Sequence, residues 1–229
     1  MGIVKVYSEM IKEFIEKNRD RKSFLEHEAK GLLRDMGLSV PEGIFIKKGD
    51  GSPAIAGLRY PLVAKVSSTK ITSKSDVHGV RTGLKNEDEL NRAVTELMQI
   101  ENSEGVLVEE MSPSGLEVIV GGIIDKQFGP VMMFGLGGIF VELFKDISFG
   151  LAPLKKEDAL WLIQQVKGYR LLEGYRGNPP VDKEALLEIL VAVSEIMATN
   201  LIKEIDLNPV ALYPERAVIL DAKMKVLTL

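Results

Sequence analysis

Apolar residues recur every three to four positions in several stretches of the chain, and this spacing predicts amphipathic helices. The predicted helices cover residues 8–18, 23–36, 87–99, 156–167 and 183–199. Ser23, with Glu26 three residues later, has the spacing of a capping box, and Asn86 stands where a helix N-cap is expected. We expect the first helix to be an N-terminal extension that packs on the core.

Runs of β-branched and other apolar residues, bounded by Gly, Pro, Ser or Asn, predict short strands between these helices. The predicted strands cover residues 40–46, 63–68, 80–84, 106–109, 117–124, 130–134, 201–206, 210–213 and 218–221. This mixture predicts an α+β fold. The turn-rich segment 110–115 is the expected hinge between two subdomains, residues 22–110 and 111–229, which follow a helical extension over residues 1–21.

The composition is that of an ordinary globular protein with a sizeable core, because 45% of the 229 residues are hydrophobic and 27% are charged. A net charge of −4 argues against a general nucleic-acid binder. The sequence has no apolar run of membrane-spanning length and no signal-peptide core at its N-terminus. We therefore expect a cytoplasmic protein that binds neither nucleic acid nor membranes.

The absence of cysteine and the presence of only two histidines limit the chemistry that this chain can perform. Disulfides, thiolate catalysis and zinc sites built from cysteine or several histidines are excluded. Any metal must be a hard cation that is held by oxygen ligands, and this points to Mg²⁺.

A single lysine, Lys65, interrupts an apolar strand and is followed at once by a loop rich in Ser, Thr, Lys and Gly that extends to Val80. A lysine in an apolar strand is costly to bury unless an anion meets it, and hydroxyls and backbone N–H groups suit phosphate. One interpretation is therefore a nucleotide triphosphate site. The other is a lysine on an edge strand whose ammonium group reaches water, and this stretch alone leaves both open.

Asp206 and Asn208 stand two residues apart at a predicted strand end, so their side chains point the same way, and Asp221 ends a nearby strand. If those strands pair, Asn208 and Asp221 present an amide oxygen and a carboxylate to one point. Mg²⁺ accepts such a sparse set when phosphates and water complete its shell. The alternative is an Asx-turn before Pro209, with Asp221 as an ordinary strand end.

Glycines and acidic residues offer weaker candidates for binding an anion or a base. Gly135, Gly137 and Gly138 would let the backbone approach a phosphate closely, although no helix begins there as a Walker loop or dinucleotide fingerprint requires. Hinge residues could give backbone hydrogen bonds to an adenine ring, and a neighbouring glutamate could face the nucleotide: Glu109, Glu110, Met111 and Glu117. Solvated surface charges are the commoner case for glutamates.

A series of motifs spread over the chain resembles one family, the ATP-grasp β subunits of ADP-forming acetyl- and acyl-CoA synthetases, which are related to succinyl-CoA synthetase β subunits. The resemblance runs from about residue 22 to the C-terminus. The motifs are His27-Glu28-Ala29-Lys30, Lys74-Ser75-Asp76, Glu117-Val118-Ile119-Val120-Gly121, Gln127-Phe128-Gly129-Pro130, Phe134-Gly135-Leu136-Gly137-Gly138-Ile139-Phe140-Val141-Glu142, Lys145-Asp146, Arg176-Gly177 and Asp206-Leu207-Asn208-Pro209.

This resemblance implies an ATP-grasp fold with the nucleotide between two α+β subdomains, and a reaction that exchanges acyl-CoA, ADP and phosphate for free acid, CoA and ATP through phosphohistidines. It also implies an α partner that binds CoA, commonly in an α2β2 complex. The implied roles are ATP phosphates at Lys65, adenine at Glu109, Glu110 and Met111, magnesium at Asn208 and Asp221, and an incoming phosphohistidine near Asp206.

The chain departs from the family pattern at the position of the relay histidine. That residue is Ser73 here, and a histidine, His78, stands where the family has a glycine. Two arginines that the family places near phosphate are Leu116 and Gly150 in this chain, which removes strong bidentate anion contacts. Two hypotheses follow: an active subunit in which His78 replaces the relay or transfer bypasses it, and a degenerate subunit that binds nucleotide or scaffolds a partner without turnover.

Overall fold

The computed structural model describes residues 3–18, 21–50, 55, 57–138 and 144–227, and their contacts divide the chain into two compact units. Unit 1 is made of Met1–Phe24, Ala29–Val40 and Ser114–Leu229, and unit 2 of Leu25–Glu28 and Pro41–Pro113. Each unit has a hydrophobic core of its own.

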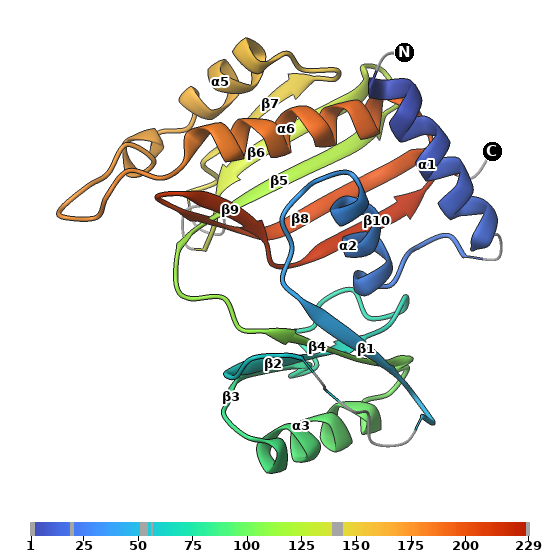
Figure 1. Cartoon of the computed structure of the whole chain (residues 1–229). Coiled ribbons are helices and arrows are strands. Elements are labelled where there is room, and N and C mark those ends of the chain that lie inside the picture. The colour runs from blue at the N-terminus through green and yellow to red at the C-terminus, as the bar shows by residue number, and fades with distance from the viewer. Residues whose placement is uncertain (1–2, 19–20, 51–54, 56, 139–143, 228–229) are drawn as a thin grey trace. The chain divides into compact units, whose positions relative to one another are not determined.

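Unit 2 is a four-stranded antiparallel sheet with one helix against it, as the lower part of Figure 1 shows. The strand order is β1-β4-β2-β3, with β1 at Gly43–Lys47, β2 at Leu62–Ser67, β3 at Val80–Leu84 and β4 at Gly105–Glu110. Helix α3, Glu87–Gln99, buries Leu90, Ala93 and Leu97 in the same core as alternate residues of β2 and β4. The N-cap prediction is confirmed, because the Asn86 side chain accepts a hydrogen bond from Glu89 N at 2.9 Å.

Unit 1 is built on a larger antiparallel sheet whose strands follow the order β10-β8-β5-β6-β7, with β9 also paired to β8. The strands are β5 (Leu116–Asp125), β6 (Gly129–Leu136), β7 (Ile147–Leu151), β8 (Ile202–Tyr213), β9 (Arg216–Ile219) and β10 (Ala222–Val226). The hairpin of β5 and β6 is in register from Val118 opposite Leu136 to Asp125 opposite Gly129, as the glycine-containing turn predicted.

The helices of unit 1 share one core with its sheet. They are α1 (Ile3–Lys17), α5 (Lys156–Gln164), α6 (Lys183–Ala198) and the part of α2 (Glu26–Asp35) that begins at Ala29; a short 3₁₀ turn covers Tyr169–Leu171. Helix α6 is the most buried, and Gly122 of β5 makes room for it, since a Cβ there would lie 2.6 Å from Met197 Cγ. Figure 1 shows α6 crossing β5 and β6.

The segment just before α2 pairs with β10 within unit 1. Ser23 forms an isolated bridge with Lys225, Phe24 N donates to Met224 O at 3.1 Å, and Val226 N donates to Lys22 O at 2.9 Å. The segment before α2 therefore extends the sheet beside β10.

The division into units differs from the predicted subdomains in one respect. The predicted hinge does contain the boundary after Pro113, but most of residues 22–40 belongs to unit 1 and not to the N-terminal subdomain. The reason is that the apolar stripe of α2, with Leu32, Leu33 and Met36, packs into the unit 1 core.

Several predicted element bounds are also corrected. Helix α1 begins at Ile3 and not at residue 8, and the predicted strands 201–206 and 210–213 form one continuous strand, β8. The structure adds β7, an edge strand of only five residues that the sequence pattern does not predict. Ser23 is not the helix cap, because it bridges Lys225 and α2 begins only at Glu26; at this helix start Glu28 Oε2 accepts from Leu25 N at 2.8 Å. Among the described residues, no helix combines the length and hydropathy needed to cross a bilayer.

Because the two cores are separate, we expect Leu97→Ala to weaken unit 2 selectively. Leu97 is fully buried, and truncation of such a leucine costs about 2–5 kcal/mol. Hydrogen exchange should show reduced amide protection in β1 to β4, while β5, β6 and β8 keep theirs. Leu160→Ala, on the surface of α5, is the control and should leave both sheets unchanged. An equal loss of protection in both sheets would contradict separate cores.

Candidate functional site

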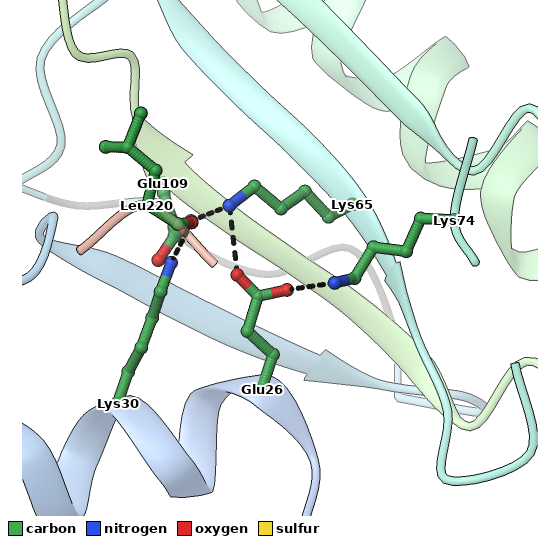
Figure 2. A network of polar contacts seen from close by, with 6 residues as sticks. All are labelled: Glu26, Lys30, Lys65, Lys74, Glu109 and Leu220. Atoms are coloured by element: carbon green, nitrogen blue, oxygen red, sulfur yellow. Dashed lines mark hydrogen bonds and ion pairs between the residues drawn. The ribbon is translucent and has the colours of Figure 1, made fainter. Parts of the chain in front are cut away.

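Lys65 lies at the centre of a buried charge cluster in unit 2 (Figure 2). Its Nζ donates to Glu109 Oε2 at 2.7 Å and to Glu26 Oε1 at 2.9 Å. The residues are 8%, 1% and 5% exposed for Lys65, Glu109 and Glu26. An ammonium group with two carboxylate partners can be buried because both its charge and its donors are met.

The strand pattern explains why these side chains meet. Ala64 and Val66 face the core under α3, so Lys65 between them points to the opposite face of the sheet. β4 is the hydrogen-bonded neighbour of β2, and Glu109 pairs with Val63, two residues before Lys65, so that both side chains share that face. β2 lies between β4 and β3, and the interpretation of Lys65 as an edge-strand lysine that reaches water is therefore wrong. Phosphate binding at Lys65 stays a prediction.

Glu26 and Lys74 belong to this cluster and were missed by sequence reasoning. Lys74 Nζ lies 2.9 Å from Glu26 Oε2, so one carboxylate meets two lysines. Glu26 is separated from Lys65 by 39 residues, and the only local signal, a glutamate in the first turn of a helix, was interpreted as part of a cap. For Glu109 the alternative of a solvated charge is also wrong, because the residue is almost fully buried.

The hinge residues Glu110 and Met111 already make hydrogen bonds of their own. Arg59 donates from Nη2 to Glu110 Oε2 at 2.9 Å and from its backbone N to Oε1 at 3.0 Å, and these bonds lower the pKa of Glu110. Glu110 N donates to Glu42 O and Met111 N to Pro61 O, each at 2.9 Å. An adenine ring at this hinge would therefore have to use the carbonyl oxygens or the exposed Met111 side chain.

His78 is exposed in the turn that follows β2, and its backbone is left-handed, with φ of +49°. Its N–H donates to Ser75 O at 3.1 Å, and its carbonyl accepts from Arg81 Nη1 at 2.6 Å. Gly79 ties the turn down, since its N–H donates to Lys74 O at 2.6 Å and its carbonyl accepts from Val66 N at 2.7 Å. The turn thus keeps a conformation that favours glycine, at the position where the resembled family has one.

In unit 1, the structure brings Asn208 and Asp221 together as the sequence predicted from strand pairing. Asn208 N donates to Asp221 O at 3.2 Å, and Leu220 N donates to Pro209 O at 2.9 Å. Lys30 of α2 donates to Leu220 O at 2.7 Å and so holds the residue before Asp221 (Figure 2). β8 continues through this region, so the alternative of an Asx-turn at residues 206–208 is not what the chain adopts.

Asp206 lies on the same face of β8 as Asn208, while Leu207 between them is buried in the core. Burial raises the pKa of the Asp206 carboxyl, Asp221 and Glu204 add to the rise, and Lys223 and Lys225 oppose it. The two carboxylates of Asp206 and Asp221 are therefore close enough to repel each other.

This donor set fits a hard cation that brings its own ligands. Carboxylate and amide oxygens are what Mg²⁺ accepts, and a cation would offset the repulsion from Asp221, which adds to the rise in the Asp206 pKa that burial mainly causes. In the described part of the chain, no group of three or more His, Cys, Asp or Glu residues gathers as a metal site. Phosphate oxygens and water would have to complete the shell.

Glu117 and the glycine block also meet within unit 1. Gly137 N donates to Glu117 O at 2.7 Å, and a Cβ on Gly137 would lie 2.8 Å from that oxygen, so only glycine fits there. Gly135 lies within β6, and Gly138 has a φ of +61° just after it. The Glu117 side chain is exposed. Residues 139–142 of the motif lie outside the described residues.

Comparisons with known proteins show the family and the fold of this chain. A model of the ATP-grasp domain matches residues 16–226. The β subunit of acetate–CoA ligase (ADP-forming) I from Pyrococcus furiosus is 43% identical over 223 residues, which cover 93% of this chain and 96% of that protein. Acetate–CoA ligase (ADP-forming) II of Archaeoglobus fulgidus is 43% identical over 203 residues, 88% of this chain but only 30% of that longer protein.

Solved structures of Ca. Korarchaeum cryptofilum dinucleotide-forming acetyl-coenzyme A synthetase 1 have the same fold. The complex with coenzyme A, Ca-AMPCP and HgCl⁺ has a TM-score of 0.84 and 39% identity, and the match covers 92% of this chain and 96% of that chain. The complex with coenzyme A and Mg-AMPPCP, with its phosphohistidine segment pointing towards the nucleotide-binding site, has a TM-score of 0.81 and 41% identity over 96% of this chain and all of that chain.

The raised pKa of Asp206 leads to a prediction about stability. A carboxyl whose folded-state pKa is raised holds its proton more tightly in the folded state, so its contribution falls as pH rises through its titration range. Asp206→Asn should therefore raise Tm at pH 7, by about 1–3 °C, and the gain should vanish in acid, where the aspartate is protonated in both states. Calorimetry across pH measures this.

Asp50→Asn, the same change on an exposed loop, is the control and should leave Tm unchanged at both pH values. If Asp206→Asn lowered Tm at neutral pH, or if the gain in Tm persisted in acid, the raised folded-state pKa of Asp206 would be contradicted.

Proposed function

The chain belongs to the ATP-grasp domain family and, within it, to the β subunits of ADP-forming acetyl-CoA synthetases, and from this membership we propose that it is the nucleotide-binding subunit of an ADP-forming acyl-CoA synthetase. The reaction is acyl-CoA, ADP and phosphate to free acid, CoA and ATP. Phosphate displaces CoA from the acyl group, and the phosphoryl group of the acyl phosphate then passes through phosphohistidine to ADP.

The observation that carries this proposal is the match to the Pyrococcus furiosus β subunit over 96% of that protein's length. The relative is named a subunit, so a partner chain is expected here too. We propose an α partner that carries the CoA-binding and acyl chemistry, in an α2β2 complex. The Archaeoglobus fulgidus relative supports this, because the matched region is 30% of one longer chain. A cytoplasmic location remains part of the proposal.

The nucleotide roles that we propose follow the positions described above. Lys65 holds the phosphates, and the hinge residues Glu109, Glu110 and Met111 lie at the adenine. Gly135, Gly137 and Gly138 let the backbone approach the phosphates, with Glu117 beside them. The complex of a related enzyme with Mg-AMPPCP supports both the nucleotide and the metal.

The place where Asn208 of β8 meets Asp221 is the metal site in this proposal. Asn208 and Asp221 hold Mg²⁺, which when bound offsets the charge of the phosphate oxygens. Asp206, on the same face of its strand, orients the incoming phosphohistidine by accepting a hydrogen bond from its imidazole N–H. Catalysis by this chain is mainly positioning and charge neutralisation.

The relay step is the point at which activity and degeneracy separate. We propose that His78 accepts the phosphoryl group in place of the missing family histidine at Ser73. The exposure of His78 supports this role, because a relay residue must be reached by its donor. The alternative is a subunit that binds nucleotide or scaffolds its partner without turnover. The match over 96% of a relative that is named as a ligase subunit favours the first hypothesis.

The variant that tests the relay is His78→Gly, because glycine suits the left-handed backbone at φ +49° and removes only the imidazole. After incubation of the complex with γ-labelled ATP and separation of the two subunits by electrophoresis, the parent chain should carry acid-labile label. His78→Gly should remove that label without lowering Tm.

Asn102→Gly is the matched control, because Asn102 is another residue of unit 2 with positive φ, +62°, and its label should be unchanged. Label on the partner subunit alone would mean that transfer bypasses His78. No label on either subunit, together with measurable Mg-ADP binding, would favour the degenerate alternative.

A further inference from the structure

One carboxylate bridges two lysines in unit 2, and this arrangement is unusual for buried charges (Figure 2). Glu26 Oε1 lies 2.9 Å from Lys65 Nζ, and Glu26 Oε2 lies 2.9 Å from Lys74 Nζ. The Lys74 side chain is only 11% exposed. The four charges of Lys74, Glu26, Lys65 and Glu109 alternate in sign along the chain of contacts and sum to zero.

Bringing two ammonium groups into a poorly hydrated site is costly, since like charges repel more strongly where water does not screen them. Glu26 offsets that repulsion by lying between them. Each lysine comes from a different segment: Lys65 from the interior strand β2, and Lys74 from the turn that also carries His78. The backbone bond from Gly79 N to Lys74 O makes Lys74 an anchor of that turn.

Stability alone is a weak explanation for this cluster. A buried ion pair commonly adds little net stability compared with apolar residues of the same volume, because desolvation of the charges opposes their attraction. Two lysines held in fixed positions are, however, what recognition of a polyphosphate requires, since each ammonium can meet a different phosphate oxygen.

We propose that Glu26 is a positioning residue that holds Lys65 and Lys74 as a two-lysine site for the phosphates of the bound nucleotide. Lys74 is then a phosphate-binding residue in its own right, and Glu26 acts through the two lysines without touching the nucleotide. This inference rests on the proposed function, because it presupposes that the chain binds ATP or ADP through Lys65.

Glu26 could have two roles, competition with phosphate for the lysines or positioning of the lysines, and the two roles predict opposite changes in nucleotide affinity for Glu26→Gln. If Glu26 only competed with phosphate for the lysines, Glu26→Gln would leave a net positive cluster and would tighten nucleotide binding. If Glu26 positions the lysines, the same variant weakens binding although it adds positive charge.

We expect Glu26→Gln to weaken Mg-ADP binding by about tenfold, measured by calorimetry on the full chain in complex with its partner subunit. Lys74→Gln should weaken it by about five- to tenfold, and Glu26→Asp, which keeps the charge, should recover part of the loss. Adenosine, which has no phosphates, should bind all variants equally. That comparison separates a lost phosphate contact from a general loss of structure.

Glu28→Gln is the matched control, because Glu28 lies on the same helix and its bond to Leu25 N survives in the glutamine. It should change Mg-ADP affinity by less than about twofold. Should Glu26→Gln fail to fold, Lys74→Gln carries the test. Unchanged or tighter Mg-ADP binding by Glu26→Gln or Lys74→Gln would overturn the inference, and so would equal losses for ADP and adenosine. Failure of the parent complex to bind Mg-ADP would instead overturn the proposed function.

Discussion

The requirement that a buried charge find a partner shapes unit 2 more than any other single interaction. Lys65 lies on an interior strand and is only 8% exposed, so its ammonium group is met by carboxylates on the neighbouring strand and at the start of α2. Glu109 and Glu26 are these carboxylates. Glu26 also pairs with Lys74 and so holds the turn after β2. A requirement that arises at one side chain in this way fixes segments that are far apart in the sequence.

The parts of the fold that depend on local signals could be predicted from the sequence. The Asn86 cap was predicted, and α3 and the β5–β6 hairpin were predicted closely, since their periodicity and turn chemistry are contained in the segments themselves. The continuity of β8 could not, because Asn208-Pro209 is a local turn signal that the pairing with three partner strands, β5, β9 and β10, overrides. The unit to which α2 belongs depends likewise on what its apolar face meets.

Some contacts of the candidate site could likewise be predicted from the sequence, and others could not. The closeness of Asn208 and Asp221 was predicted, because strand pairing follows from short-range pattern and the two residues are near in sequence. The bridge from Glu26 to Lys65 was not, since 39 residues separate them and nothing local distinguishes that glutamate from a helix cap. The use of the Glu110 and Met111 N–H groups by Glu42 and Pro61 also depends on tertiary pairing, which a hinge sequence does not reveal.

The bridge between Ser23 and Lys225 has a consequence for the order in which the protein is made. All of unit 2, residues 25–28 included, lies before Ser114, so the whole unit is available once Pro113 has left the ribosome. Unit 1 also contains the segment around Ser23, and this segment can form its bridge to Lys225 only after β10 has been made. During synthesis the apolar face of α2 is therefore exposed until the strands and helices that follow Ser114 have emerged, and Asn208 can meet Asp221 only after β9 has been made.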